Sequence, residues 1–305
     1  MRLLIVGAGS TGGYLGARLA QAGRDITFLV RPTRALQLRE TGLRIQSAHG
    51  DATLYPTLVT AGEIAQPYDA VLLAVKGYQL ANVLEDIAPA VGPETMILPV
   101  LNGMGHMETL ARRFTKHNLV GCTLKVATVL EDDGRIVQLS PMQDFAFGEL
   151  DGGVTSRIEA LDAFFRDANI GARLSRVIGR EMWEKWILLA SVGAITCLTG
   201  GTIGEIEACT GGASFALQLL EEIVTIVKVV GEPPSDTFLH LTREQLTAKG
   251  SPFVSSMFRD VQRGRPVEVE EIIGALVRHA GEAGIATPLL SAAYVKLLVY
   301  QHKVR

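Results

Sequence analysis

The chain has 305 residues, a formal net charge of −3 at pH 7 and 20% charged residues. This length suits two domains of about 100–200 residues each. Because no basic excess is available to neutralise phosphate groups, the composition argues against nucleic acid or an anionic membrane as a partner. The three cysteines, Cys122, Cys197 and Cys209, are odd in number and outside any metal-ligand spacing. They are predicted to be buried thiols of a reducing compartment, and no metal site is expected.

No targeting or membrane-spanning segment is predicted. The apolar start of the chain is only about six residues long, whereas the apolar core of a secretory signal needs about 7–15. The longest apolar run, 186–198, is interrupted by Ser191 and Gly193. It falls short of the ~20 residues that span a bilayer. We therefore expect a cytoplasmic protein.

In the first half of the chain, short apolar runs alternate with helical patterns. Strands are predicted at 3–6, 26–30, 70–75 and 96–101, and helices at 13–22, 33–40, 80–90 and 107–115. Segment 43–55 is predicted to be an additional β excursion. Continuous aliphatic runs are typical of parallel strands buried on both faces. Their alternation with helices predicts a doubly wound parallel sheet.

The pattern changes after Val120. Three more strands are predicted at 123–130, 135–139 and 145–148, with Asp132-Asp133-Gly134 as a hairpin turn. Nearly all of the remaining sequence is helical in pattern, at 156–169, 181–199, 212–230, 237–249, 269–283 and 288–299. The predicted fold is α/β, with an N-terminal Rossmann-type doubly wound sheet and an all-helical C-terminal domain. We place the sheet domain at 1–174 and the helical domain at 175–305.

A glycine-rich motif, Gly7-Ala8-Gly9-Ser10-Thr11-Gly12, lies between the first predicted strand and the first predicted helix. The first glycine permits a tight turn, the second lets a pyrophosphate approach the backbone, and the third allows the helix to pack closely on the strand. The helix N-terminus adds oriented N–H groups and a positive dipole. All six residues are therefore candidates for cofactor binding, the alternative being a glycine-rich turn without a ligand.

The end of the second predicted strand indicates which dinucleotide binds. A site for NAD usually carries Asp or Glu there, to bind the ribose 2′-hydroxyl. Here Val30 is followed by Arg31, with Arg34 close behind, and the nearest acid, Asp25, begins the strand at the wrong end. A guanidinium can bind a 2′-phosphate through two hydrogen bonds. NADPH is therefore predicted, unless Arg31 is simply a solvated surface residue.

Two polar residues follow later strands of the predicted sheet. Lys76 comes after the strand ending at Val75, and Asn102 comes after the strand ending at Leu101. Both are predicted at the carboxyl edge of the sheet, where open α/β folds bind their ligands. An amide at 102 can bridge a cofactor ribose and a substrate. The alternative is that Asn102 and Gly103 merely form the turn that ends the strand.

The helical half contributes two further polar features. Lys185 lies in an otherwise apolar helix, where it either reaches out to water along its aliphatic stem or faces a functional cavity. In such a cavity desolvation would lower the lysine pKa. Farther along, Ser255 and Ser256 open a strongly polar stretch that runs through Asp260 to Glu268. A solvated loop accounts for most of these charges.

Taken together, these segments resemble the ketopantoate reductase (2-dehydropantoate 2-reductase) family over nearly the whole chain. The matching residues are the glycine motif, Arg31, Lys76, Asn102-Gly103-Met104-Gly105, Trp183-x-Lys185, Ser255-Ser256-Met257 with Glu268 at the family's spacing, and the tail Ala283-Gly284-Ile285-Ala286-Thr287-Pro288. Each piece is a modest signal. Their order and spacing together are specific.

The resemblance implies hydride transfer from NADPH to a 2-keto acid, giving a D-2-hydroxy acid. By analogy, Lys185 would protonate the developing alkoxide and Glu268 would bind and orient the substrate. Ser256 would hold the substrate carboxylate, Asn102 would contact cofactor and substrate, and Lys76 would lie beside both as a positive charge. With the cofactor on one domain and Lys185 on the other, catalysis is expected in an interdomain cleft. Independently, an ammonium near the carbonyl oxygen stabilises growing negative charge and can supply the proton.

The sequence departs from the family at three positions that often carry asparagine. Leu189 and Gly193 stand four and eight residues after Lys185, and Ile273 stands five residues after Glu268. Fewer amides should favour a more apolar substrate, unless Ser191 or Thr196 compensates.

Ketopantoate reduction in pantothenate biosynthesis is therefore the first reading, and the second is a sibling reductase for another branched or aromatic 2-keto acid. A non-catalytic NADP(H) sensor is a third, disfavoured because a sensor has no need of an acid like Lys185. The apolar segment 215–230 could form a homodimer interface or simply be core.

Overall fold

The computed structural model describes residues 1–304 and divides into two compact units. The first contains residues Met1–Leu101 and His106–Gly179. The second begins at Arg180 and also includes the short segment Asn102–Gly105. The predicted domain boundaries, 1–174 and 175–305, differ from this division chiefly in the placement of that segment.

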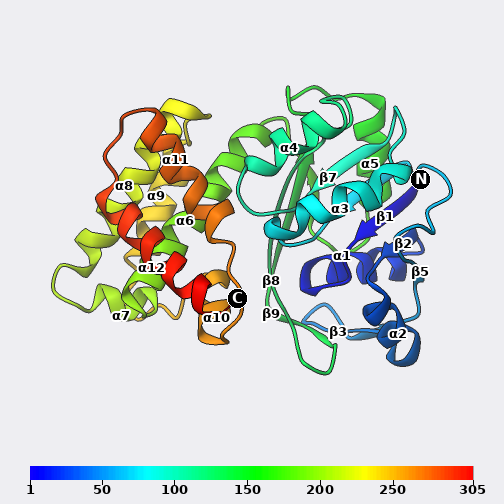
Figure 1. Cartoon of the computed structure of the whole chain (residues 1–305), viewed down its shortest axis with the longest axis horizontal. Helices are drawn as coiled ribbons and strands as arrows, with labels where there is room; N and C mark the ends of the chain where they lie inside the picture. Colours follow the sequence, from blue (N-terminus) through cyan, green and yellow to red (C-terminus); the bar gives the residue numbers. More distant parts are fainter. Residues whose placement is uncertain (305) are drawn as a thin grey trace. The chain divides into compact units, whose positions relative to one another are not determined.

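A five-stranded parallel sheet forms the centre of the first unit (Figure 1). Its strands are β1 (Arg2–Val6), β2 (Asp25–Leu29), β5 (Thr57–Val59), β6 (Ala70–Leu73) and β7 (Met96–Pro99). They lie in the order β5-β2-β1-β6-β7 with parallel register throughout, for example Leu3 opposite Ile26 and Ala70. This is the strand order of a dinucleotide-binding sheet, in which the direction of winding reverses between β1 and β6.

Both faces of this sheet are covered, which explains the uniformly apolar strands. The helices of the unit are α1 (Ser10–Gln21), α2 (Pro32–Thr41), α3 (Leu80–Ile87), α4 (Gly105–Arg113) and α5 (Ser156–Phe165), with short 3₁₀ turns at Gly77–Gln79 and Ala88–Ala90. Leu3 and Ile5 of β1 join the core formed with α1 and α5. Leu4 and Val6 join the core formed with α3 and α4. Alternate residues of one strand thus enter two separate cores.

A second sheet packs on the α1 side of the same unit. It consists of β3 (Leu43–Gln46), β4 (Ala52–Leu54), β8 (Gly121–Leu130), β9 (Ile136–Gly148) and β10 (Ala172–Leu174). Strands β8 and β9 form the predicted hairpin. The two strands predicted at 135–139 and 145–148 are in fact one strand, β9. The pairing with β8 shifts register between Val126 and Thr128, and this irregularity accommodates Pro141.

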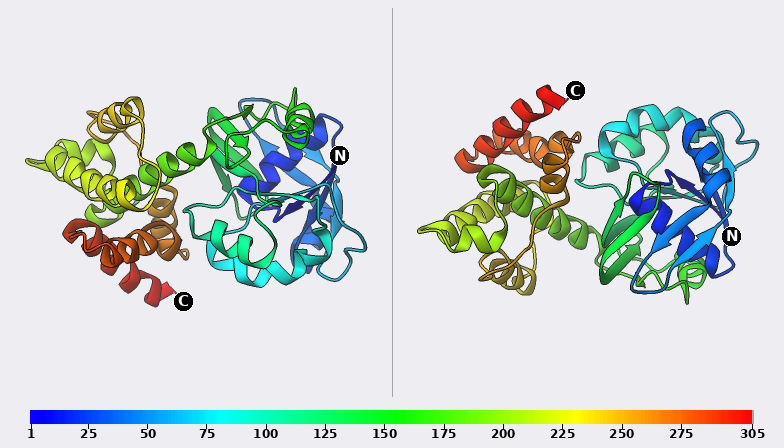
Figure 2. Two further views of the ribbon diagram at one scale, coloured as in Figure 1. Left: turned by 90° about the horizontal axis from the view of Figure 1, so that it is seen from above. Right: turned by 90° about the horizontal axis from the view of Figure 1, so that it is seen from below.

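Every regular element that the structure describes in the second unit is helical (Figure 2). Its helices are α6 (Ile178–Thr199, which starts in the first unit), α7 (Ile203–Glu207), α8 (Gly212–Val230), α9 (Asp236–Leu246), α10 (Ser256–Gln262), the π-helical turn η3 (Glu270–Gly274), α11 (Ala275–Glu282) and α12 (Pro288–Val304). The predicted fold class, a Rossmann-type sheet followed by an all-helical region, is therefore confirmed. Between residues 1 and 304, no helix is both long and apolar enough to span a bilayer.

Three local predictions need correction. The polar stretch after Ser255 is not simply a loop, because Ser255 accepts a hydrogen bond from the Phe258 amide and starts helix α10. The helix predicted at 269–283 is interrupted at its start by the π-helical turn η3. Of the three cysteines only Cys122 and Cys197 are buried, whereas Cys209 is exposed.

Candidate active site

The glycine motif forms the turn between β1 and α1, next to the point where the strand order reverses. Gly7 has a φ of +96°, which residues with a side chain rarely adopt. A Cβ on Gly12 would lie 2.2 Å from the Gly7 carbonyl oxygen and 2.8 Å from the Ala74 Cβ. By contrast, nothing lies within 4 Å of a Cβ built on Gly9. Gly7 and Gly12 are thus required by the protein itself, whereas Gly9 borders open space.

This geometry fits a dinucleotide pyrophosphate. Gly9 is the N-cap of α1, and no side chain satisfies the first N–H groups of that helix. Those groups can therefore bind an anion, assisted by the helix dipole. The open side of Gly9 allows a ligand to approach the backbone closely.

Two arginines extend this region on the β2 side. Arg31 is exposed at the N-cap of α2, and its guanidinium has no hydrogen-bond or ion-pair partner among residues 1–304. Arg34 Nε donates to the Ala8 carbonyl at 3.2 Å, and Nη1 donates to the Gln37 side chain at 2.5 Å. Burial and the charge of Arg44 lower the pKa of Arg34. Arg34 therefore stabilises the glycine turn, and the Arg31 guanidinium remains available to an external phosphate.

Lys76 and Asn102 follow β6 and β7, as predicted, but they belong to different units. Lys76 is half-buried in the first unit and caps the 3₁₀ turn at Gly77–Gln79. Asn102 lies in the short segment assigned to the second unit, where its Nδ2 donates to Glu268 Oε2 at 3.2 Å. The structure thus brings together two of the predicted site residues, which are 166 positions apart in sequence.

The turn that carries Asn102 is fitted closely to the chain after Glu268. Gly103 has a φ of +78°, and a Cβ there would lie 2.3 Å from the Glu271 carbonyl oxygen. Glycine is therefore required both by the turn and by this contact. Asn102 and Gly103 form a bend shortly after β7 ends at Pro99, and this bend places the amide against a buried carboxylate.

Lys185 lies on α6 and is only 9% exposed. This burial excludes the reading in which its stem merely carries the ammonium out to water. Glu268 is also buried, at 4% exposure, and lies just before the helical segment that starts at Val269. Both candidates for acid and substrate binding are therefore interior groups of the second unit.

The two serines before Met257 have different surroundings. The Ser255 hydroxyl is buried, caps α10, and lies 3.3 Å from the Thr196 hydroxyl of α6. Ser256 is half-buried and makes no side-chain hydrogen bond with residues 1–304. Ser255 therefore attaches α10 to α6, while Ser256, the predicted carboxylate ligand, keeps its hydroxyl available.

The three positions that lack the family's asparagines lie in apolar surroundings. Leu189 is half-buried and Ile273 fully buried in the helical core. A Cβ on Gly193 would lie 2.7 Å from the terminal methyl group of Met257. Of the two hydroxyls considered as substitutes, that of Thr196 already donates to the Val192 carbonyl at 2.6 Å, and that of Ser191 is buried without a partner among the described residues.

Two features of this region could not be predicted from the sequence. Glu271 follows Glu268 on the π-helical turn, and its pKa is raised by burial and by the charges of Glu268 and Glu270. Trp186, next to Lys185, donates its indole N–H to the Ile272 carbonyl at 2.9 Å. A tryptophan in an apolar helix is usually core, so only the structure could reveal this bond.

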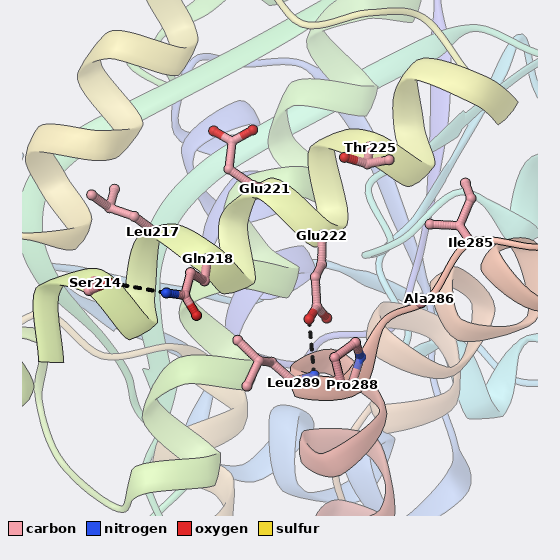
Figure 3. A pocket seen from close by; sticks show the side chains of 10 residues that line it. All are labelled: Ser214, Leu217, Gln218, Glu221, Glu222, Thr225, Ile285, Ala286, Pro288 and Leu289. Carbon is pink, nitrogen blue, oxygen red and sulfur yellow. Dashed lines mark hydrogen bonds between the residues drawn. The ribbon is translucent and has the colours of Figure 1, made fainter. Parts of the chain in front are cut away.

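A groove of about 850 Å³ in the second unit lies apart from all of these residues. Figure 3 shows α8 along one side and the connection to α12 along the other. Glu222 accepts hydrogen bonds there from the Leu289 and Leu290 amides and so caps α12. Its lining includes none of the predicted site residues.

Comparisons with known proteins agree with this picture. Residues 3–152 match the family model of ketopantoate reductase PanE/ApbA, and residues 177–301 match the model of its C-terminal domain. The uncharacterized oxidoreductase YkpB of Bacillus subtilis is 36% identical over 301 residues, which is 99% of each chain. A 2-dehydropantoate 2-reductase from Geobacter metallireducens has a TM-score of 0.87 at 28% identity, over 98% of this chain and 99% of its own.

D-mandelate dehydrogenase, solved with NADH and anilino(oxo)acetate, shares the fold alone, with a TM-score of 0.88 at 19% identity over 100% of this chain and 99% of its own. The parallel sheet and its glycine turn have the architecture of a dinucleotide-dependent oxidoreductase. With both family models matched, the chain belongs to the ketopantoate reductase family.

Proposed function

We propose that this protein uses NADPH to reduce a 2-keto acid to a D-2-hydroxy acid, with ketopantoate, and thus pantothenate biosynthesis, as the first candidate. The observation that carries the proposal is the hydrogen bond between Asn102 and Glu268. It joins the Asn102 amide to a buried carboxylate within the second unit, which also contains Lys185. Family membership supports the reaction class.

In this proposal the first unit binds the cofactor, which supplies the hydride when it is bound. The amides at the start of α1, including those of Ser10 and Thr11, bind the pyrophosphate. Arg31 binds the 2′-phosphate, and an arginine fork suits that group geometrically. Lys76 adds a positive charge near the nicotinamide end.

The second unit binds and protonates the substrate. Ser256 holds the substrate carboxylate, and Asn102 with Glu268 orients the molecule. As negative charge develops on the carbonyl oxygen, the Lys185 ammonium stabilises it and then donates a proton. Because Lys185 is buried, little water competes with the substrate for that ammonium.

A second candidate is a sibling reductase for another branched or aromatic 2-keto acid. It is favoured by the apolar surroundings of Leu189, Gly193 and Ile273. An apolar lining discriminates weakly for a substrate hydroxyl, whereas a lining built from amides discriminates strongly. Ketopantoate carries such a hydroxyl, so its preference over a branched 2-oxo acid should be small if these residues line the substrate site.

The deciding experiment is a panel of ketopantoate, a branched 2-oxo acid and an aromatic 2-oxo acid, each assayed with NADPH and with NADH. The highest kcat/KM for ketopantoate supports the first candidate, and a highest value for another acid supports the second. Binding of NADPH without turnover of any acid would support a sensor and refute the proposal.

Arg31→Ala should weaken the binding of NADPH about ten- to a hundredfold and the binding of NADH much less. Equal losses would contradict the 2′-phosphate assignment.

A homodimer remains a proposal of its own. Most apolar residues of α8 are buried within the second unit and are core, as one of the two readings held: Ala216, Leu219, Leu220, Ile223, Val224, Ile226 and Val227. Phe215, Leu217 and Val230 are half-buried, and Val229 is exposed at 64%. Light scattering after size-exclusion chromatography would determine the oligomeric state, and a monomer mass across the working concentration range would refute the dimer.

A further inference from the structure

The chain after Glu268 does not form a regular α-helix. Residues Glu270–Gly274 form a π-helical turn, in which the Ala275 amide bonds to the Glu270 carbonyl five residues earlier. Such turns contain one residue more than an α-helical turn and often occur at functional sites. Removing that extra residue from the turn would rotate everything before it by about 100° about the helix axis. The π-helical turn therefore determines the direction in which Glu268 points.

Contacts from three other segments hold this turn in place. Trp186 of α6 donates its indole N–H to the Ile272 carbonyl at 2.9 Å, and this bond is buried. Gly103 lies flat against the Glu271 carbonyl, where any side chain would collide. Tyr294 of α12 donates its hydroxyl to Glu270 at 2.9 Å.

Trp186 lies in the hydrophobic core of the second unit. Its side chain is 1% exposed, and its ring lies 5.3 Å from that of Trp183 and 6.3 Å from that of His279. It directly follows Lys185 in α6, and its acceptor Ile272 donates its own amide to the Glu268 carbonyl at 3.1 Å. One continuous path of covalent and hydrogen bonds thus runs from Lys185 through Trp186 and Ile272 to Glu268.

We propose that Trp186 is a positioning residue, whose indole N–H fixes the π-helical turn and thereby holds Glu268 in register with Lys185. The inference rests on the proposed function and extends it to a residue that touches neither substrate nor cofactor. If the bond were lost, the buried Ile272 carbonyl would lack this donor and the turn could relax toward an α-helix. Glu268 would then rotate away from Asn102, and a displacement of about 1 Å is enough to slow catalysis about a hundredfold.

The test compares Trp186→Phe with Trp183→Phe. Both variants exchange an indole for a phenyl ring on the same helix, but Trp183 makes no side-chain hydrogen bond with residues 1–304. With the best 2-keto acid of the panel, Trp186→Phe should lower kcat about ten- to a hundredfold and change the Kd of NADPH less than twofold. Trp183→Phe should keep kcat within about twofold of wild type. Equal kcat values for the two variants would overturn the proposal.

A second measurement does not depend on turnover. Amide hydrogen exchange over residues 268–275 should accelerate in Trp186→Phe but not in Trp183→Phe, because only the first variant releases the turn. Unchanged exchange in Trp186→Phe refutes the role of Trp186, whether or not the protein reduces a 2-keto acid. Failure to reduce any 2-keto acid refutes only the proposed function. If Trp186→Phe does not fold, Tyr294→Phe loosens the opposite side of the turn. It should accelerate the same amides and lower kcat, and wild-type behaviour in both measurements would overturn the proposal.

Discussion

In the glycine turn, alanine substitutions at Gly9 and Gly12 should have different effects. Gly12→Ala places a methyl group 2.2 Å from the Gly7 carbonyl oxygen and 2.8 Å from the Ala74 Cβ, and neither atom belongs to a flexible side-chain end. Gly9→Ala places a methyl group where nothing lies within 4 Å, at a φ of −83° that alanine tolerates. The first change should therefore damage the fold and the second should damage the ligand site.

The magnitudes follow from these contacts. Alanine in a helix is favoured over glycine by about 0.5–1 kcal/mol, which would stabilise Gly12→Ala if there were space. Overpacking typically costs about 1–3 kcal/mol, and a contact this short belongs at the upper end of that range. The collision should therefore outweigh propensity and lower Tm by about 2–8 °C. Gly9→Ala should leave Tm within about 1 °C of wild type, because the methyl group meets no protein atom.

Cofactor affinity should show the opposite contrast. A methyl group at position 9 holds the pyrophosphate away from the amides of α1, and a charge-assisted hydrogen bond is worth about 1.5–3 kcal/mol. The Kd of NADPH should therefore rise about ten- to a hundredfold in Gly9→Ala. The assays are differential scanning fluorimetry without cofactor and fluorescence titration with NADPH. A Gly9→Ala protein that binds NADPH normally, or that unfolds as early as Gly12→Ala, would refute the assignment of the two glycines.

Three further predictions concern the helical unit and one buried ion pair. Lys185→Ala should lower kcat about 10²–10⁴-fold and leave the Kd of NADPH within about twofold. Stopped-flow turnover measures kcat and a direct titration measures the Kd, and an unchanged kcat would contradict the assigned role. Glu222→Gln should destabilise the protein by about 1 kcal/mol without changing kcat, because the carboxylate caps α12 through two amides; urea unfolding measures this, and an unchanged midpoint would contradict the capping role. Glu149 pairs with Arg157 at 2.6 Å, and hydrogen bonding to Arg157 holds the pKa of that carboxyl below its usual range. The contribution of this pair to the free energy of unfolding is therefore fully present above the usual glutamate pKa and is lost as the pH falls through the lowered pKa. Glu149→Gln should thus lower the free energy of unfolding at pH 7, and the difference from wild type should disappear in acid.

Much of the first unit could be predicted because its signals are local. The parallel strands are buried on both faces, so each reads as an uninterrupted apolar run. The glycine motif has a specific meaning only between a strand and a helix, and both neighbours were recognisable in the sequence. Pairings that depend on distant segments were not. Strand β5 is three residues long and pairs with β2, and β9 continues through Pro141 because its partner β8 tolerates a change of register there.

The helical unit was predicted well in outline and poorly in detail. Apolar periodicity predicts each helix, but it does not distinguish an α-helical turn from a π-helical one. At Glu270–Gly274 the difference is one backbone hydrogen bond, stabilised by Trp186 from a helix more than 80 positions earlier in the sequence. The role of Ser255 was hidden for a similar reason, since an N-cap is visible only when the helix after it is recognised.

These differences explain why the sequence predicts the cofactor more precisely than the substrate. A pyrophosphate is bound by backbone amides, so the sequence must supply glycines at set positions, and those positions can be read directly. A keto acid is bound by side chains whose directions depend on how helices pack, and here one such direction depends on a single π-helical turn. Gly193 illustrates the point: the same glycine that removes an amide also makes room for Met257. Exchanging Gly193 for Asn would therefore have to displace Met257 before it could offer an amide to any substrate, and restoring a family residue at one position should not by itself restore a preference for ketopantoate.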